Sequence, residues 1–88
     1  MTLRESIEVR IHCGIHSRIG VELVKIAEST GVAIQLTVND RSVDCRCILE
    51  VLSLALTRGS YVRVGIKGKA AEKAMSSVRK LLQGEADD

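Results

Sequence analysis

The 88-residue chain has no proline, phenylalanine or tryptophan, and Tyr61 is its only aromatic residue. A core without large rings must be built from isoleucine, valine, leucine and alanine side chains. One aromatic residue is too few for a platform on which the bases of single-stranded nucleic acid stack. The basic residues are also scattered among acidic ones, and the formal net charge is only +2. We therefore expect no nucleic-acid partner.

Long hydrophobic runs and paired cysteines are absent as well. The apolar runs are far too short to span a bilayer, and no positively charged leader with an apolar segment opens the chain. Cys13, Cys45 and Cys47 make an odd number without a disulfide framework, which is typical of a reducing compartment. We therefore expect a cytoplasmic protein without membrane insertion.

The chain is the length of one small domain, which we expect to span residues 1–88 with its core over about 5–84. Apolar residues at every second position predict strands over 7–12, 32–38, 41–45 and 61–67. Helical spacing predicts helices over 17–30, 47–56 and 71–82. Residues 1–6 are expected to be a lead-in and residues 85–88 a frayed tail.

Turn and cap residues support these boundaries. Ser17 is the expected N-cap of the first helix, while Gly31 and Gly84 are expected to end the first and last helices. Each strand has one apolar face, so the strands form a sheet with one face open to water and helices on the other. The element order predicts an α+β fold, an open-faced β-sandwich with three helices on one side of a four-stranded antiparallel sheet.

The segment 47–56 is unusually apolar, since only Glu50 and Ser53 are charged or hydroxylated within it. A helical core stripe is expected at four positions, namely Ile48, Val51, Leu52 and Ala55. Three further leucines then exceed what one stripe needs, namely Leu49, Leu54 and Leu56. The pattern leaves two alternatives open, a helix buried on several sides or a docking surface that a partner covers.

The stretch from Cys13 to Arg18 joins the first strand to the first helix. Backbone N–H groups at a helix start are unpaired and favour anions, and Arg18 adds a planar charged fork suited to phosphate. His16 offers a ring nitrogen that can act as a nucleophile near neutral pH. This arrangement is typical of a site that handles a phosphoryl group, although the local sequence alone favours a loop histidine and a solvated arginine.

A metal site could be suggested by His12, Cys13 and His16. His12 and Cys13 are adjacent in a predicted strand and point to opposite faces, which argues against shared coordination. We expect no metal and no cofactor. A small-molecule enzyme has little support either, because no second cluster of acids or bases accompanies His16 in the sequence.

Three motifs in this order resemble the HPr family, the histidine-containing phosphocarriers of the bacterial phosphoenolpyruvate:sugar phosphotransferase system. Residues 14–18 (Gly-Ile-His-Ser-Arg) resemble the active-site motif, and residues 46–54 resemble the second-helix motif. Residues 59–62 through Lys73 and Ala74 resemble the last strand and helix. The likeness covers about residues 5–84 and implies the same open-faced sandwich.

The resemblance implies a phosphocarrier that has no turnover of its own. His16 would accept a phosphoryl group from phospho-Enzyme I on Nδ1 and pass it to a sugar-specific IIA domain. Arg18 would neutralise the phosphate, and N–H groups around Ser17 and Arg18 would bind its oxygens. The docking residues implied for both partners are Val21, Ile48, Leu49 and Leu52. We expect a monomer.

The chain departs from the family pattern at three positions. The family usually has proline at Ile19 and alanine at Gly20. A glycine inside a helix costs roughly 1 kcal/mol against alanine, and the close approach of another segment would explain its presence. Cys47 occupies the position of a serine that is phosphorylated in Gram-positive members, so that regulation is not expected here, and Ser53 matches a different position. The departures keep open an alternative, a regulatory module that signals to a transcriptional regulator or a kinase. For Cys47 two alternatives remain, a site without regulation, which is favoured, or a redox-sensitive replacement for serine.

Overall fold

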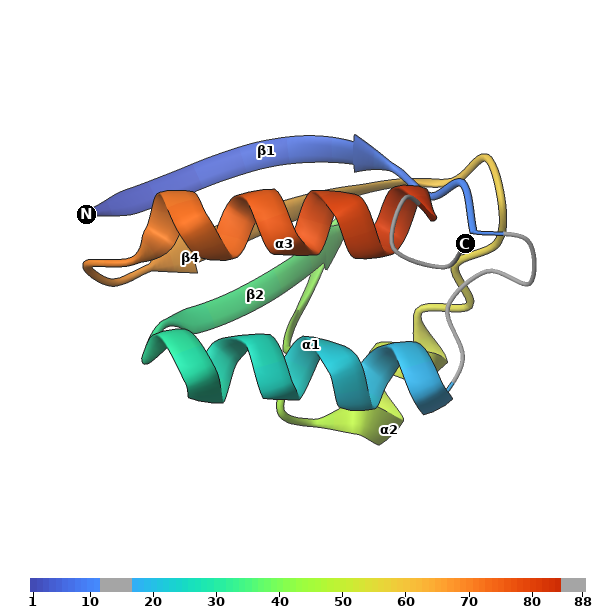
Figure 1. Cartoon of the computed structure of the whole chain (residues 1–88). Coiled ribbons are helices and arrows are strands. Elements are labelled where there is room, and N and C mark those ends of the chain that lie inside the picture. The colour runs from blue at the N-terminus through green and yellow to red at the C-terminus, as the bar shows by residue number, and fades with distance from the viewer. Residues whose placement is uncertain (12–16, 85–88) are drawn as a thin grey trace.

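The fold is that of a computed structural model, which describes residues 1–11 and 17–84. The chain forms seven elements in these ranges: β1 (Thr2–Glu8), α1 (Ser17–Thr30), β2 (Ala33–Val38), β3 (Arg41–Asp44), α2 (Ile48–Ser53), β4 (Tyr61–Lys67) and α3 (Ala71–Gln83). The predicted order of strands and helices is confirmed (Figure 1).

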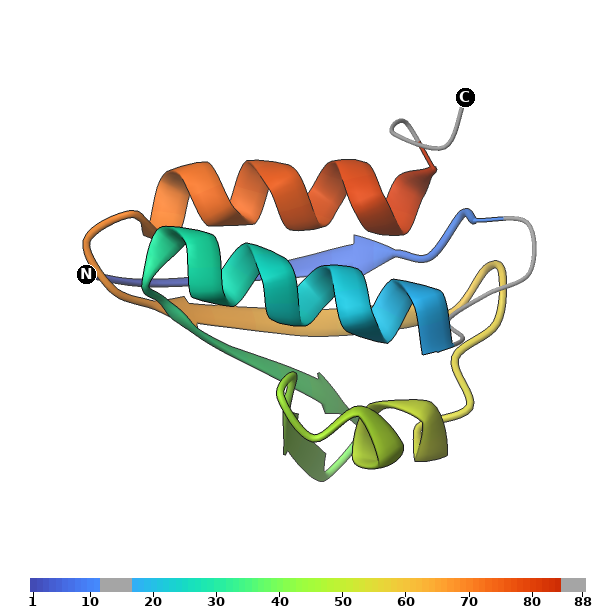
Figure 2. The ribbon, with the colours of Figure 1, turned by 60° about the horizontal axis from the view of Figure 1, so that its bottom comes forward.

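The four strands form one antiparallel sheet in the order β1-β4-β2-β3. The last strand in the sequence, β4, therefore lies between β1 and β2. The three helices cover one face of this sheet, with α1 lying between α3 and α2 (Figures 1 and 2). The other face, which we call the open face, carries the outward residues of all four strands. This arrangement is the predicted open-faced sandwich.

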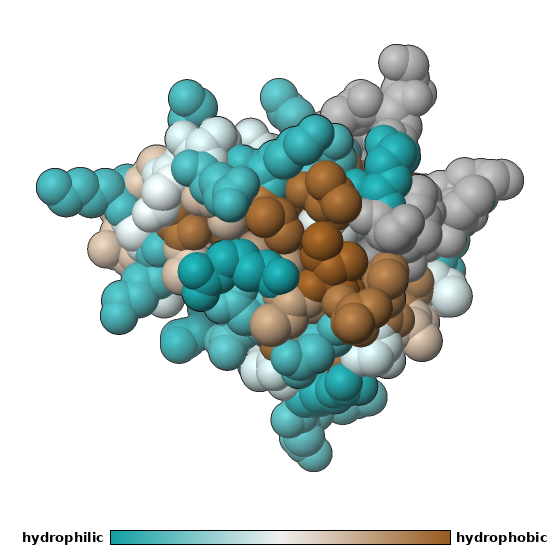
Figure 3. Space-filling model, turned by 90° about the horizontal axis from the view of Figure 1, so that it is seen from below, coloured by the Kyte–Doolittle hydropathy of each residue, from teal (hydrophilic) through white to brown (hydrophobic). Residues whose placement is uncertain are grey.

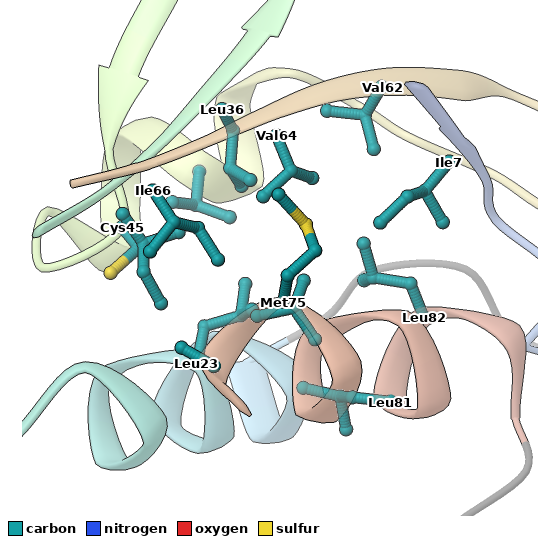
Figure 4. Close-up of a cluster of buried hydrophobic side chains, with 14 of the residues drawn as sticks. Ile7, Leu23, Leu36, Cys45, Val62, Val64, Ile66, Met75, Leu81 and Leu82 are labelled. Atoms are coloured by element: carbon teal, nitrogen blue, oxygen red, sulfur yellow. The ribbon is translucent and has the colours of Figure 1, made fainter. Parts of the chain in front are cut away.

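The core between the sheet and the helices is aliphatic, as the composition requires. Alternate residues of β2 and β4 point toward the helices, and Met75 of α3 points back toward the sheet (Figure 4). The predicted inward face of α3 is confirmed, since all six of its members are buried: Ala71, Ala74, Met75, Val78, Leu81 and Leu82. Within residues 1–11 and 18–84, no polar or charged residue is buried.

The ends of the two long helices follow the predicted glycines. Gly31 and Gly84 adopt left-handed φ values of 70° and 80°, which glycine reaches without steric cost. Val32 N–H then donates to Ala27 C=O at 3.1 Å, closing the end of α1. The helix start differs slightly from the prediction, because α1 includes Ser17 as its first residue. None of the helices in the described part of the chain is long and apolar enough to cross a membrane.

The predicted start of β1 is wrong, because residues 1–6 are not a lead-in but belong mostly to the strand. The strand begins at Thr2 and pairs with β4 from Thr2 opposite Lys67 to Glu8 opposite Tyr61. Its first half lacks apolar alternation because Glu5 stands where a core residue would be expected. Arg79 of α3 donates two hydrogen bonds to the Glu5 carboxylate, at 2.8 and 2.9 Å. Residues 9–11 lie beyond the strand, although Val9 and Ile11 are buried as expected.

The segment 47–56 also differs from its prediction. The helix is only six residues long, and Ala55 turns the chain in a left-handed conformation with a φ of 54°. Ala55 is therefore exposed, whereas Leu56 enters the core. Of the predicted stripe, Val51 is buried, and Ile48 and Leu52 are half-buried.

Candidate functional site

The start of α1 is the anchor of the candidate site. Ser17 is the first helical residue, and Arg18 is exposed in the first turn. The first N–H groups of a helix have no intrahelical partner and carry partial positive charge. His16 lies outside the described residues, together with His12 and Cys13. The described part of the site is thus a helix start whose amides and Arg18 suit an anion.

An apolar surface flanks this helix start. Leu49 of α2 is 82% exposed and Val21 of α1 is 41% exposed, whereas Ile48 and Leu52 are half-buried. Hydrophobic residues gather on the side of the molecule formed by α1 and α2 (Figure 3). We call Val21, Ile48, Leu49 and Leu52 the α1–α2 surface. Exposure of its two members Val21 and Leu49 to water is unfavourable unless a partner covers them.

Gly20 explains how α2 lies so close to α1. A Cβ placed on Gly20 would lie 3.2 Å from Ile48 Cγ2, which is tighter than an ordinary van der Waals contact. The missing side chain therefore makes room for Ile48 between the helices. A close approach of another segment is thus the reason for a glycine inside this helix, as expected, although the periodicity of α1 alone does not identify the neighbour on α2. The close approach brings α2 against the first turns of α1, the helix that carries Val21.

The turn from β3 into α2 is fixed by Asp44 and Arg46. Arg46 donates its backbone N–H to Asp44 Oδ1 at 2.9 Å and its Nη2 to Oδ2 at 3.1 Å. These hydrogen bonds hold the pKa of Asp44 below its ordinary value. In the same turn, the backbone N–H of Cys47 donates to Asp44 C=O at 3.0 Å. The start of α2 is therefore held at the edge of the sheet by local contacts.

Cys47 is exposed immediately before α2, and its C=O accepts the N–H of Val51 at 3.0 Å. A hydrogen bond with the Glu50 side chain raises the pKa of the Cys47 thiol. A raised pKa leaves less thiolate, which is the reactive form in oxidation. This environment opposes the hypothesis that Cys47 is a redox-sensitive replacement for serine.

Ser53 is engaged in structure at the other end of α2. Its Oγ donates to Glu50 C=O at 2.6 Å and accepts a hydrogen bond from Arg41 Nη2 at 2.6 Å. The residue thus ties the last turn of α2 to β3. This role agrees with its exclusion from the candidate regulatory position.

Metal coordination receives no support from the described ranges. No group of three or more histidine, cysteine, aspartate or glutamate side chains is arranged to hold an ion in residues 1–11 and 17–84. The three residues weighed for a metal, His12, Cys13 and His16, are outside those ranges.

Comparisons with known proteins match nearly the whole chain. The family model described as the PTS HPr component phosphorylation site matches residues 3–84. Phosphocarrier protein HPr of Vibrio cholerae is 24% identical over 78 residues, which cover 89% of this chain and 92% of that protein. Phosphocarrier protein HPr of Neisseria meningitidis is 26% identical over 82 residues, which cover 93% and 92%.

Solved structures share the fold. The phosphocarrier protein HPr of Bacillus anthracis superposes with a TM-score of 0.84 at 22% identity, covering 93% of this chain and 98% of its own. Crh of Bacillus subtilis, a catabolite repression containing protein whose structure was described as a swapped dimer, has a TM-score of 0.74 at 23% identity, with 94% and 95% covered.

Proposed function

Because the chain belongs to the HPr family, the phosphocarriers of the phosphotransferase system, which are not enzymes, we propose that it carries a phosphoryl group on His16. Phospho-Enzyme I is the donor, and sugar-specific IIA domains are the acceptors. In this proposal the chain acts as a cytoplasmic monomer and as a single domain over residues 1–88.

The start of α1 supplies the chemistry. The Nδ1 lone pair of His16 attacks phosphorus, and the bond between phosphorus and the donor breaks as the new P–N bond forms. The three phosphoryl oxygens then lie near the guanidinium of Arg18 and the N–H groups of Ser17 and Arg18. Charge-assisted hydrogen bonds from such fixed donors stabilise the phosphoryl group without covalent chemistry of their own.

The α1–α2 surface is the observation that carries the proposal. A carrier must hold each partner long enough for transfer and then release it, so a small apolar contact suits it better than a large interface. Leu49 is 82% exposed and lies one residue after Ile48, which contacts the first turns of α1 at Gly20. The apolar contact is therefore beside the helix start, where the phosphoryl group is transferred.

The proposal is tested by intact mass after the protein is mixed with phosphoenolpyruvate and Enzyme I. The wild type should gain one acid-labile phosphoryl group, and a IIA domain added afterwards should remove it. His16→Ala should gain none. His12→Ala is the matched control, because His12 is the only other histidine of the chain, and it should label normally. Labelling of His16→Ala would overturn the assignment.

A regulatory module is the second candidate, favoured by the fold shared with Crh. Such a module would report its phosphorylation state to a transcriptional regulator instead of moving sugar. A pull-down with the phosphorylated protein separates the two: recovery of a regulator without any IIA domain supports the module, and recovery of IIA domains supports the carrier.

A further inference from the structure

The open face of the sheet, on the side away from the helices, has a hollow of about 390 Å³ that the proposed carrier function does not use. It extends over all four strands. Gly65 of β4 lies in it, and Arg4, Gln35, Asp44 and Lys67 are among the residues that line it. Arg4 and Gln35 lie directly opposite Gly65 on the neighbouring strands, and Asp44 lies opposite Gln35. These residues thus form one row across the sheet, with Gly65 as its lowest point.

Neither conformation nor packing requires a glycine at position 65. Its φ is not in the left-handed region. A Cβ placed there would meet only Arg4 Cγ at 3.9 Å and Gln35 C=O at 4.0 Å, both ordinary contacts. Glycine inside a strand is destabilising by roughly 0.5–1 kcal/mol relative to alanine, and it often marks a place where a ligand approaches the backbone. The missing side chain leaves the sheet open at the centre of the hollow.

The charges around the hollow are unevenly matched. Arg4 and Lys67 are exposed, and neither forms an ion pair with any residue of the described ranges. Asp44, at the other end of the row, is already paired with Arg46 at 3.1 Å. The end formed by β1 and β4 therefore has two uncompensated cations, whereas the end formed by β2 and β3 has amide and carboxylate oxygens that can accept hydrogen bonds.

We propose that this hollow binds a small phosphate ester that carries hydroxyl groups. The phosphate lies between Arg4 and Lys67, and the hydroxyl groups donate to the side-chain oxygens of Gln35 and Asp44. Gly65 lets the ligand approach the backbone of β4. Since the helices lie on the other side of the sheet, the ligand and a partner on the α1–α2 surface can be bound at the same time (Figure 2).

The test is a titration of the ¹⁵N-labelled protein with glucose 6-phosphate, followed by amide chemical shifts. Saturable shifts are expected at Ala33, Gly65 and Lys67, and glucose should cause none. Lys67→Gln and Arg4→Gln should each weaken binding about tenfold, the size expected for one charge-assisted hydrogen bond. Gly65→Val should abolish binding while the sheet is retained, because valine is favoured in strands; circular dichroism checks the fold.

Arg63→Gln is the matched control, because Arg63 is on the same strand and the same face but does not line the hollow. It should bind as the wild type does. Shifts confined to the first turn of α1, or equal affinity in Lys67→Gln and the wild type, would overturn the proposal. Inorganic phosphate binding as tightly as glucose 6-phosphate would overturn the assignment of an ester.

Discussion

The helices α3 and α2 lie on either side of α1 and use their apolar residues in opposite ways (Figure 2). Six of the 13 residues of α3 are buried, and Gly84 closes its last turn. Only Val51 is buried among the six residues of α2, which has no side-chain hydrogen bond at its N-cap. A buried stripe of six residues holds α3 on the sheet, whereas α2 has one buried residue, the turn before its start and the contact of Ile48 with Gly20.

This difference shows that the apolar content of a helix does not by itself indicate whether its side chains serve folding or partner binding. In α3 the large side chains contribute to folding, since burial of one such side chain is worth roughly 1.5–3 kcal/mol. In α2 Leu49 contributes almost nothing to folding because it remains 82% exposed. The favourable free energy of burying Leu49 is gained only when a partner covers this side chain.

The largest expected effect is on stability and separates the two helices directly. Leu82→Ala in α3 should lower the free energy of unfolding by about 2–5 kcal/mol, because it leaves a cavity where the side chain is fully buried. Leu49→Ala in α2 removes the same atoms and should change it by less than about 0.5 kcal/mol. Urea denaturation followed by circular dichroism measures both, and equal losses would contradict the comparison.

Buried and exposed positions should also differ in their response to alkali. Burial raises the pKa of the Cys45 thiol to about 11 from an ordinary 9.0. The folded state therefore favours the thiol, and its contribution is complete below pH 9 and is lost as the pH rises from 9 to 11. The loss should amount to roughly 2–3 kcal/mol.

Cys45→Ala provides the control for this alkaline loss. The variant should be less stable at neutral pH because of its cavity, but it should lack this component of the decline between pH 9 and 11. It retains Cys47, whose exposed thiol should contribute little. Parallel declines of the wild type and the variant in urea denaturation at each pH would show that Cys45 is not responsible.

The comparison predicts the reverse ranking when partner binding is measured. Leu49→Ala should raise the apparent KM for phosphorylation by Enzyme I about tenfold with little change in kcat, since an exposed leucine that becomes buried is worth more than 1 kcal/mol. Tyr61→Ser is the control, because Tyr61 is 63% exposed but lies on the open face of the sheet. A similar rise in KM for both variants would mean that the binding of Enzyme I depends on exposed apolar area on either face of the molecule, and not on the α1–α2 surface.

The smallest effect concerns the contact between α1 and α2. Gly20→Ala gains helix propensity of about 1 kcal/mol, but its Cβ forces Ile48 to shift, so the free energy of unfolding should hardly change. In an Ile48→Ala background the same substitution should stabilise the protein by about 1 kcal/mol. The double-mutant cycle, measured by urea denaturation, should thus give a coupling of about 1 kcal/mol. Equal effects in both backgrounds would mean that the helices do not meet at Gly20.

Periodicity predicted the elements whose two faces differ clearly. In β4, Val62, Val64 and Ile66 alternate with outward residues, and the stripe of α3 repeats at helical spacing, so both were placed correctly. In β1, Glu5 broke the pattern because its partner is Arg79, which is far away in the sequence. In the segment 47–56, all residues but Glu50 and Ser53 are apolar, so the sequence could not show that the chain turns at Ala55 and that Leu56 is buried.

The candidate site was predictable only as far as local chemistry reaches. The position of the α1 start and the exposure of Leu49 agree with the sequence reasoning. A close approach at Gly20 could be expected from the sequence, but its partner Ile48 could not be predicted, because it comes from another helix. The same holds for Gly65, which depends on neighbours from β1 and β2.

The position of β4 at the centre of the sheet sets the time at which the protein can fold during synthesis. The first strand pairs only with β4, from Thr2 opposite Lys67 to Glu8 opposite Tyr61, and β2 pairs with β4 on its other side. Until the ribosome has released residues 61–67, only the hairpin of β2 and β3 can form, and a two-stranded hairpin is marginally stable alone. The nascent chain must therefore keep β1 without its partner until β4 has left the ribosome, and the sheet then assembles in one step.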